Sequence, residues 1–414
     1  MTFHHQHSLA PLAIDMEKEL RNNILPFWLK QIDPGGGFIA QTDHRGVEEK
    51  NAPKGCLLNS RILWTFARAA RQLDHEDCFL GAKHAYDYLI KAFEDVELGG
   101  LFWSVDGQGQ PLDTSKHIYN QAFGVYALAE WYAICQEPEV LSKALALAQL
   151  IETYGADSRY GGYRESFNRC WQTLPNVLIC DTEDVVSEKS MNTHLHILEA
   201  YSRLYQVHPE KWLGDRIRQL IRLLTETMQN PGASFFQFFS ASWQVQSKNH
   251  SYGHDIEGSW LISAANQILQ MDTEQSPTRQ TVLAMAEQVL KYGRDSDGSV
   301  MNEWIEGRHI NADKVWWVQA EAVVGFANAW QMSGDQRYLV AAYQAWGFTR
   351  KFLIDHDYGE WHWQTDRWGK PDENRSKLEF WKCPYHNGRA CMEIMARSVS
   401  EASKFAPTVP TRAF

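Results

Sequence analysis

The chain has 414 residues, of which 44% are hydrophobic, and a formal net charge of −11 at pH 7. This charge, with no basic run along the chain, argues against a nucleic-acid-binding protein, and no apolar run is long enough to span a bilayer. The seven cysteines include no Cys-x-x-Cys pair, and the N-terminus lacks the basic-then-apolar order of a signal peptide. We therefore expect reduced thiols and a cytoplasmic protein.

Turn segments that combine glycine with aromatic residues recur along the chain, mostly at intervals of roughly 62 residues, with one longer step in the middle. A fixed period of this kind indicates a repeat architecture. Each turn is followed by a short alternating stretch, such as residues 101–107, which is typical of a small β-hairpin. The turn segments are residues 34–38, 98–103, 160–163, 234–238, 297–300 and 357–363.

Between these hairpins the apolar residues follow helical periodicity. The predicted helices are residues 14–32, 57–73, 77–93, 118–134, 139–154, 190–206, 210–229, 255–271, 278–293, 314–332, 336–353 and 384–404. They form six pairs, and the first helix can pair with the last. The sequence therefore predicts an all-α fold, an (α/α)6-barrel of six helical hairpins with short β-hairpin connections. We expect one domain over residues 1–414, with its core at about 14–404.

An open α-solenoid is the alternative arrangement of such helix pairs. It requires terminal helices with a polar outer face. The first predicted helix contains the run Ile-Leu-Pro-Phe-Trp-Leu at residues 24–29, which is mostly apolar. This composition favours a closed ring over an open solenoid.

Polar and aromatic residues gather at the starts of alternate helices. These helices follow the hairpins and are expected to form an inner ring, with their N-terminal ends on one side. Burying so many polar groups costs several kcal/mol unless they meet partners, water or a ligand, so they predict a funnel at one end of the barrel. The residues are Asn59 and Arg61; Tyr119 and Asn120; Asn192, His194 and His196; His254 and Glu257; Trp316, Trp317 and Glu321; and His386 and Arg389.

Spacing indicates which of these residues share a helix face. Asn192 and His196 are four residues apart, and His254 and Glu257 are three apart, so each pair lies on one face. His194 is two residues from His196, and both cannot point inward. A metal site built from His194 and His196 is therefore not expected. For any single pair, a satisfied polar contact in the core is the ordinary interpretation, and the recurrence in six repeats is what favours a functional site.

The residue types in the funnel suit proton transfer at carbon. The sequence has no P-loop, dinucleotide fingerprint or serine elbow. Two neutral histidines on different helices can flank a carbon acid, and a glutamate beside a histidine fixes its tautomer and raises its basicity. An arginine and a further histidine can stabilise an enediolate. Inversion at the carbon next to an aldehyde requires this combination.

Two other chemistries are compatible with parts of the pattern. Glycoside hydrolysis needs two carboxylates on either side of a glycosidic bond, and Glu257 and Glu321 could serve, although each is better explained as a residue that orients a histidine. Metal-dependent sugar isomerisation is a further alternative. It would need metal-ligand spacing with open carboxylates, which the sequence does not show.

Five segments in order resemble the N-acylglucosamine 2-epimerase superfamily and, within it, the cellobiose 2-epimerases. They are LNSRILW at 58–64, KSMNTHLH at 189–196, YGHDIE at 252–257, WWVQAE at 316–321 and WKCPYHN at 381–387. The resemblance extends from near residue 15 to near residue 400. It implies an (α/α)6-barrel isomerase, without metal or organic cofactor, that acts as a monomer on a small-molecule sugar.

The resemblance also implies a reaction. Family members interconvert glucose and mannose units at the reducing end of β-1,4-linked disaccharides such as cellobiose, lactose and mannobiose, through ring opening and a cis-enediolate. Members that act on free mannose, glucose or fructose share much of the pattern, so a monosaccharide epimerase or isomerase is the alternative. A non-catalytic binding barrel is a third reading, against which the intact histidine pair argues.

The roles implied by the resemblance fall on ten residues. His254 and His386 would be the two acid/base residues, with Glu257 and Glu321 orienting them. Arg61, Asn192 and His196 would hold the open-chain oxygens and the enediolate, Trp317 and Trp381 would stack on sugar rings, and Tyr119 would support them. Two further segments are candidates for shaping the site: residues 179–188, with Asp181 and Asp184, and residues 237–250.

Overall fold

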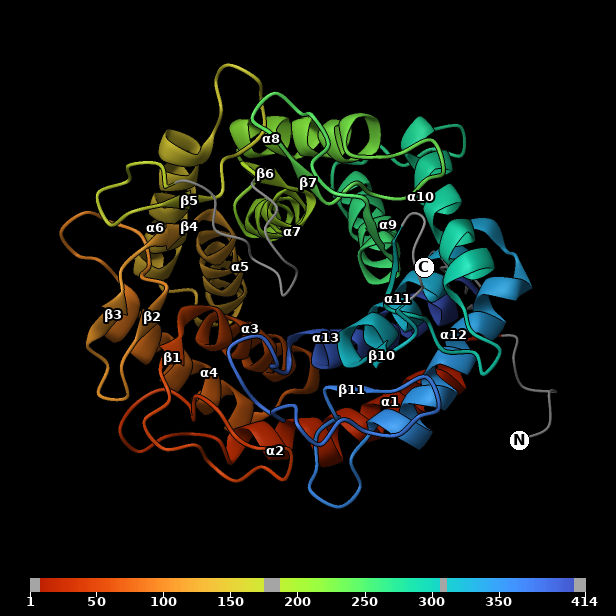
Figure 1. Ribbon diagram of the computed structural model, residues 1–414, viewed down its shortest axis with the longest axis horizontal. Helices are drawn as coiled ribbons and strands as arrows, with labels where there is room; N and C mark the ends of the chain where they lie inside the picture. Colours follow the sequence, from red (N-terminus) through yellow and green to blue (C-terminus); the bar gives the residue numbers. More distant parts are fainter. Residues whose placement is uncertain (1–7, 175–186, 306–310, 406–414) are drawn as a thin grey trace, which may run out of the picture.

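The helices form two concentric rings around a central axis, six in each ring (Figure 1). The computed structural model describes residues 8–174, 187–305 and 311–405. The inner ring consists of α3 (Cys56–Leu73), α5 (Ile118–Cys135), α7 (Met191–Val207), α9 (Tyr252–Ile268), α11 (Trp316–Ser333) and α13 (Tyr385–Phe405). The outer ring begins with the first helix, which comprises α1 (Ala10–Glu19) and α2 (Leu25–Leu29). Its other members are α4 (Glu76–Tyr88), α6 (Pro138–Leu150), α8 (Lys211–Arg222), α10 (Pro277–Gln288) and α12 (Gln336–Phe348).

The inner ring is closed. Each inner helix packs against the inner helices on both sides, and α13 packs against α3 to complete the circle. Each outer helix packs mainly on one inner helix, and α1 packs on α13, so the first helix pairs with the last. The predicted (α/α)6 fold is confirmed, and the open solenoid is excluded.

Burial explains which helices lie inside. In α5 every residue from Ile118 to Trp131 is buried, and a helix that is apolar nearly all round belongs in a core. In α8 only one stripe, which includes Leu213, Ile217 and Leu220, is buried. The outer helices α4, α6, α8, α10 and α12 each end in a π-helical turn, so that they extend to residues 93, 155, 227, 293 and 353. These ends lie within two residues of the predicted ones.

The connections contain more strand pairing than the predicted local hairpins. A local hairpin is present where β2 (Ser104–Val105) pairs with β3 (Pro111–Asp113). In addition, the strands before the inner helices α3, α5, α7, α9 and α11 each pair with a strand of the next repeat. The pairs are β1 (Lys54–Gly55) with β2, β4 (Lys116–His117) with β5 (Ser166–Phe167), β6 (Lys189–Ser190) with β7 (Phe238–Phe239), β8 (Asn249–Ser251) with β9 (Glu303–Ile305), and β10 (Lys314–Val315) with β11 (Gln364–Thr365).

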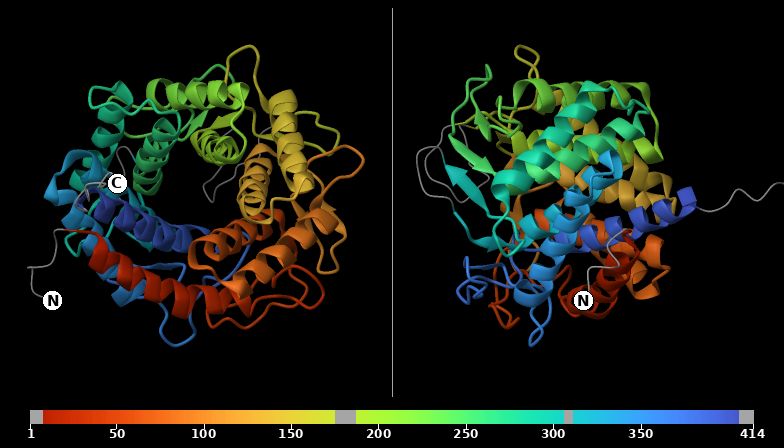
Figure 2. Two further views of the ribbon diagram at one scale, coloured as in Figure 1. Left: turned by 180° about the vertical axis from the view of Figure 1, so that it is seen from behind. Right: turned by 90° about the vertical axis from the view of Figure 1, so that its right-hand side faces the viewer.

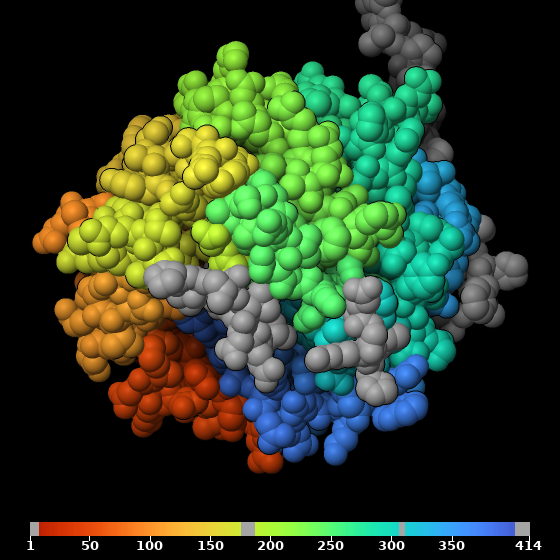
Figure 3. All heavy atoms as spheres, turned by 45° about the horizontal axis from the view of Figure 1, so that its top comes forward, coloured from red at the N-terminus to blue at the C-terminus, as the bar shows by residue number. Residues whose placement is uncertain are grey.

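These strands gather at one end of the barrel, where the inner helices begin (Figure 2). A single bridge between Thr42 and Leu378 joins the first connection to the last, so the chain of strand pairings also goes round the ring. Figure 3 shows the successive connections arranged around this end in sequence order, with a hollow between them. Across the described ranges, no helix combines the length and the apolar character needed to cross a membrane.

A buried lysine fixes the turn in five of the connections. Each lysine pairs with the aspartate that begins the turn. It lies two residues before the inner helix in four of the repeats, and eight residues before α13 in the last. The pairs are Lys54–Asp33, Lys116–Asp95, Lys189–Asp157, Lys314–Asp295 and Lys377–Asp355. In the remaining repeat, Asn230 and His250 are in contact at the corresponding place. The sequence analysis did not identify this repeated pair.

We expect Asp157→Asn to destabilise the barrel. Lys189 and Asp157 are 2.8 Å apart, and their side chains are 0% and 1% exposed. The substitution would leave a buried ammonium group without its counter-charge, which costs about 3–5 kcal/mol. The melting temperature measured by calorimetry should therefore fall.

Asp87→Asn is the matched control. Asp87 pairs with Lys83 at 2.6 Å, but both side chains are 55% exposed, and such pairs contribute less than about 1 kcal/mol. Equal melting temperatures for the two variants would show that the buried pair does not stabilise the connection.

Candidate active site

A cavity of about 650 Å³ lies at the end of the barrel where the inner helices begin. Nine of the ten predicted site residues line it, and the tenth, Glu321, lies behind His386. The predicted residues in the wall are Arg61, Tyr119, Asn192, His196, His254, Glu257, Trp317, Trp381 and His386. The sequence patterns thus identified residues that the fold brings together from all six inner helices or their immediate N-terminal flanks.

Local capping sets the position of two histidines. The side chain of Ser190 accepts a hydrogen bond from the backbone N–H of Thr193, and that of Ser251 accepts one from the N–H of His254. Serine at this position satisfies an N–H group that the helix leaves unpaired. Because α7 and α9 begin at fixed points, His196 and His254 are held in the first two turns, beside the cavity.

His194 faces away from the cavity, as its spacing from His196 predicts. Its Nε2 accepts a hydrogen bond from the N–H of Tyr163 at 2.8 Å, and its Nδ1 bonds the carbonyl of Ser190. Gln121 and Gln319 make equivalent bonds to the turns of their own repeats. His194 is therefore a structural residue that holds a connection in place.

His386 is held by a carboxylate. Its Nδ1 lies 2.7 Å from Oε1 of Glu321, whose other oxygen accepts a hydrogen bond from Trp260 Nε1 at 2.9 Å. A carboxylate accepts the Nδ1 proton, which leaves the lone pair on Nε2. Burial lowers the pKa of His386 well below its ordinary value. The ring is thus a neutral base at pH 7.

His196 has the same arrangement with a residue that the sequence analysis missed. Its Nδ1 lies 3.0 Å from Oε2 of Glu199, three residues further along α7. Burial lowers the pKa of His196 as well. The signal for Glu199 was available, because its spacing from His196 equals the spacing that singled out Glu257 beside His254.

The predicted pairing of Glu257 with His254 is wrong. Oε1 of Glu257 accepts a hydrogen bond from Arg389 at 2.5 Å. Within the described ranges, Nδ1 of His254 has no hydrogen-bond partner, and its ring packs on Trp317 with centroids 4.9 Å apart. Burial lowers the pKa of His254 to about 3. The two residues share a helix face, but the guanidinium from α13 is the stronger partner for the deeper carboxylate.

Arg389 joins the carboxylates into one cluster beneath the cavity. Its side chain is 1% exposed and pairs with Glu199, with Glu257 at 2.5 Å and with Glu321 at 2.7 Å, each from a different inner helix. Burial alone would raise the pKa of Glu199, but the interactions with Arg389 and His196 outweigh this effect and lower the pKa to about 2. Burial and the neighbouring Glu321 raise the pKa of Glu257 to about 8.

The cluster also bears on metal binding. Glu257, Glu321 and His386 offer ligand atoms within 4.8 Å of one another. Arg389 already donates to both carboxylates, so a metal ion would have to displace the guanidinium and bring a further buried positive charge next to it. These three residues are therefore a poor fit for a cation. Independence from metals stays a prediction.

The opposite wall of the cavity carries Arg61 and aromatic rings. Nη2 of Arg61 donates to the hydroxyl of Tyr119 at 2.7 Å, and its guanidinium lies 4.3 Å from the ring centroid of Phe123. Trp381 lies 5.9 Å from Tyr119 and 6.2 Å from Trp103, between ring centroids. Trp103, which also lines the cavity, lies in one of the repeated turns, but the sequence analysis did not assign it to the site.

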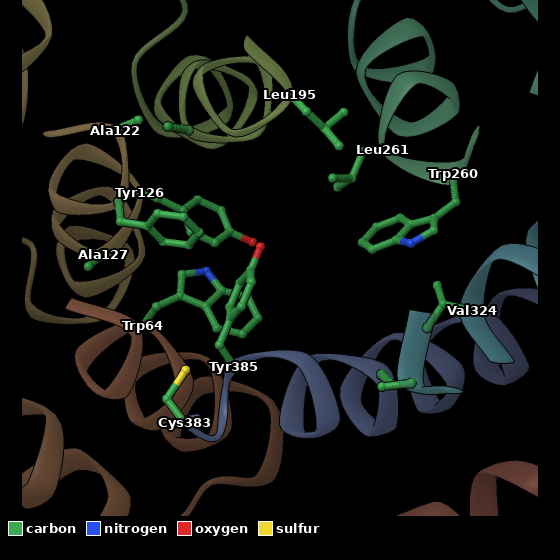
Figure 4. Packing of buried hydrophobic residues seen from close by; sticks show 14 of the residues in the cluster. Trp64, Ala122, Tyr126, Ala127, Leu195, Trp260, Leu261, Val324, Cys383 and Tyr385 are labelled. Carbon is green, nitrogen blue, oxygen red and sulfur yellow. The ribbon is translucent and has the colours of Figure 1, made fainter. Parts of the chain in front are cut away.

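A second cavity, of about 570 Å³, lies beyond the cluster, toward the ends of the inner helices. Glu199 and Trp260 line it, together with Trp64 and Tyr126. Figure 4 shows these aromatic side chains and Tyr385 extending from different inner helices toward the axis. The layer that contains Arg389 therefore forms the floor of the candidate active site.

The two candidate shaping segments have different outcomes. Residues 179–186, which include Asp181 and Asp184, lie outside the described residues. Residues 237–250 form β7, a turn and part of β8, and none of them lines the cavity. A role of this second segment in shaping a sugar subsite stays a prediction.

Closed helical rings around a cavity lined by buried histidines suit proton transfer at carbon, and the comparisons show that the protein is an isomerase, a carbohydrate epimerase. The chain belongs to the N-acylglucosamine 2-epimerase (GlcNAc 2-epimerase) family, whose model matches residues 37–386. It is 38% identical to a cellobiose 2-epimerase of Bacteroides fragilis over 391 residues, which cover 93% of this chain and 98% of that protein.

Two further similarities place the chain within the family. The solved structure of a cellobiose 2-epimerase from Bacillus thermoamylovorans is 39% identical, with a TM-score of 0.90, and the match covers 94% of this chain and 100% of that one. A D-mannose isomerase of Marinomonas mediterranea is 24% identical over 412 residues, which cover 92% of this chain and 96% of that protein.

We expect Glu321→Gln to slow turnover of the sugar substrate by about 10–100-fold, because a neutral amide supports the Nδ1 proton of His386 less well than a carboxylate. The KM should change little, since Glu321 does not line the cavity. Steady-state kinetics would measure both constants.

Glu393→Gln is the control for this change. Glu393 lies on the same helix as His386 but pairs with Arg68 and Arg397, each at 3.7 Å, near the other end of the barrel. Its turnover should equal that of the unmodified enzyme. Equal losses in the two variants would contradict a specific role for Glu321.

Proposed function

We propose that this enzyme interconverts the glucose and mannose units at the reducing end of β-1,4-linked disaccharides, such as cellobiose, lactose and mannobiose. The observation that carries the proposal is the 38% identity to a cellobiose 2-epimerase over nearly the full length of both chains, against 24% for a D-mannose isomerase. The cavity geometry supports the same reaction.

The proposed chemistry begins with the open-chain aldehyde. One histidine removes the proton from C2 through its Nε2, the C–H electron pair forms a C1=C2 double bond, and the carbonyl electrons move to O1. The product is a cis-enediolate. A second histidine, which has taken up a proton from solvent, then returns that proton to the other face of C2. This step restores the carbonyl and gives the epimer, and it leaves the second histidine neutral and the first protonated.

We assign the two proton transfers to His254 and His386. They come from α9 and α13, and both rings pack near Trp317, with centroid distances of 4.9 and 5.5 Å. Two bases around one indole are well placed to act on one bound carbon. Arg61, Asn192 and His196 then hold the open-chain oxygens and the developing negative charge.

Glycoside hydrolysis is a poorer fit to the same residues. Its two carboxylates must reach opposite sides of a glycosidic bond, whereas Glu257 and Glu321 both contact Arg389, and Glu321 does not line the cavity. A likeness to solved α-mannanase structures at 12% identity, with a TM-score of 0.62, shows a shared fold alone.

Aromatic rings at the cavity wall support a sugar substrate. Trp317 and Trp381, with Tyr119 beside them, offer apolar faces on which sugar rings stack. The single-domain organisation, the monomeric state and the independence from metals and organic cofactors stay predictions.

The direct test is NMR of the purified enzyme with cellobiose in D2O and EDTA. We expect mannose-type reducing-end signals to grow, with deuterium at C2, because the proton that returns comes from an exchanged histidine. Unchanged cellobiose alongside conversion of free mannose would refute the disaccharide proposal in favour of a monosaccharide enzyme. Epimerisation without deuterium at C2 would refute the enediolate route.

The pH dependence follows from the direction of the histidine pKa shifts. Burial lowers the pKa of His254 to about 3 and lowers that of His386, so the ring that removes the C2 proton stays available as a base below the ordinary histidine pKa. We expect kcat/KM to stay level from pH 8 down to about pH 5. A fall centred near pH 6.5 would show that the bases titrate as exposed histidines.

A further inference from the structure

Arg389 is close to the catalytic histidines but does not reach the substrate cavity. The cavity is lined by His386, His196 and Glu257 among the described residues, and Arg389 is absent from its wall. The guanidinium is 1% exposed and lies under the cavity floor. Any effect of Arg389 on the reaction must therefore pass through other side chains.

Three hydrogen-bonded connections lead from Arg389 to the cavity: Glu257, which accepts from Arg389 at 2.5 Å, lines the cavity itself, and two longer branches end on histidines. In the first, Arg389 donates to Oε1 of Glu321 at 2.7 Å, and the same oxygen holds Nδ1 of His386 at 2.7 Å. In the second, Arg389 pairs with Glu199, whose Oε2 lies 3.0 Å from Nδ1 of His196. His254 belongs to neither branch.

The remaining contacts hold the guanidinium in one orientation. It lies 4.8 Å from the ring centroid of Trp260 and 4.2 Å from that of Tyr385. Trp260 donates to the second oxygen of Glu321, and the hydroxyl of Tyr385 contacts Glu199. The planar fork of an arginine can serve several carboxylates at once, which a lysine cannot do.

Removal of this charge would change the state of the glutamates. Glu199 and Glu321 are buried beside Glu257, and without the cation they would take up protons because neighbouring buried carboxylates cannot all ionise. A protonated Glu321 or Glu199 no longer serves as a full acceptor for a histidine Nδ1 proton. The affected ring could then carry its proton on Nε2, where the base needs its lone pair.

We propose that Arg389 is a positioning residue that keeps Glu321 and Glu199 ionised and thereby fixes the Nδ1–H tautomer of His386 and His196 together. This inference rests on the proposed function for its meaning in catalysis, but the tautomers are properties of the protein alone. Arg389 links the base to the residue that holds the enediolate oxygens, and loss of Arg389 disturbs both.

The kinetic test compares Arg389→Gln with the unmodified enzyme over a range of pH, using cellobiose. We expect kcat to fall at neutral pH and to recover in part as the pH rises and the glutamates ionise, so that the acid limb moves upward by about one pH unit or more. The KM should change little. A loss of kcat that is equal at every pH would overturn the proposal.

Arg397→Gln is the matched control. Arg397 lies on the same helix, two turns further along, and its Nη1 donates to Asn328 and Gln331, both at 3.0 Å. It has no contact with the three glutamates among the described residues. We expect an unchanged pH profile, and the same shift in Arg397→Gln would overturn a specific role for Arg389.

A second readout is independent of turnover. In 15N-histidine NMR spectra, with signals assigned through His386→Gln and His196→Gln, both rings should be Nδ1–H tautomers in the unmodified protein and change in Arg389→Gln. Unchanged tautomers would overturn the proposal. If the protein shows no exchange at C2 of any sugar, the proposed function fails, and these spectra still decide the role of Arg389.

Two substitutions keep the test decisive if Arg389→Gln does not fold. Arg389→Lys keeps the charge but not the fork, and should give a smaller shift of the acid limb. Glu199→Gln removes only one branch, so the His196 signal should change while the His386 signal stays. The two-branch arrangement would be contradicted if both His196 and His386 lost the Nδ1–H tautomer in Glu199→Gln. An acid limb that does not move in Arg389→Lys would contradict it as well.

Discussion

The ion cluster of Arg389 with Glu199, Glu257 and Glu321 is the interaction on which the site depends. It joins α13 to α7, α9 and α11 at the axis of the barrel. Buried ions are costly unless every partner is in place, so the cluster is compatible with one arrangement of these helices. That arrangement brings His386 and His196 to the cavity wall. The same ion cluster thus holds the inner helices together and sets the positions of the catalytic histidines.

The repeat assigns different tasks to fixed positions of the inner helices. Counted from the helix starts, the second and sixth residues face the cavity; they are four apart and share a face. The fourth residue turns outward and bonds the backbone of a connection, and the ninth residue lies below the floor. The cavity-facing residues are Tyr119, Asn192, Trp317 and His386 at the second position, and Arg61, His196 and Glu257 at the sixth; Glu321, the sixth residue of α11, lies behind His386 instead. The fourth position holds Gln121, His194, Asp255 and Gln319, and the ninth holds Trp64, Tyr126, Glu199 and Trp260.

This division of roles among helix positions explains which features of the fold and the site could be predicted from the sequence. Helical periodicity gave the helix pairs and their ends, and polar residues at equivalent positions gave the cavity wall. The strand pairs between repeats were missed, because two-residue strands have no periodicity and their partners are about 50 residues away. The partner of Glu257 was misassigned for a related reason: spacing within a helix shows which face a residue is on, but not which side chain from another helix reaches it first.

The structure leaves the two proposed bases in unequal surroundings. His386 has Glu321 behind its Nδ1, and the developing positive charge of a protonated ring would meet a carboxylate. His254 has no acceptor at Nδ1 in the described ranges, and its ring packs against that of Trp317. Protonated His254 is therefore the stronger acid and His386 the stronger base. Epimerisation needs each ring to take a proton in one direction and return it in the other, so the inequality favours proton removal by His386 and proton return by His254. The face of C2 presented to each ring then decides which epimer is deprotonated more readily.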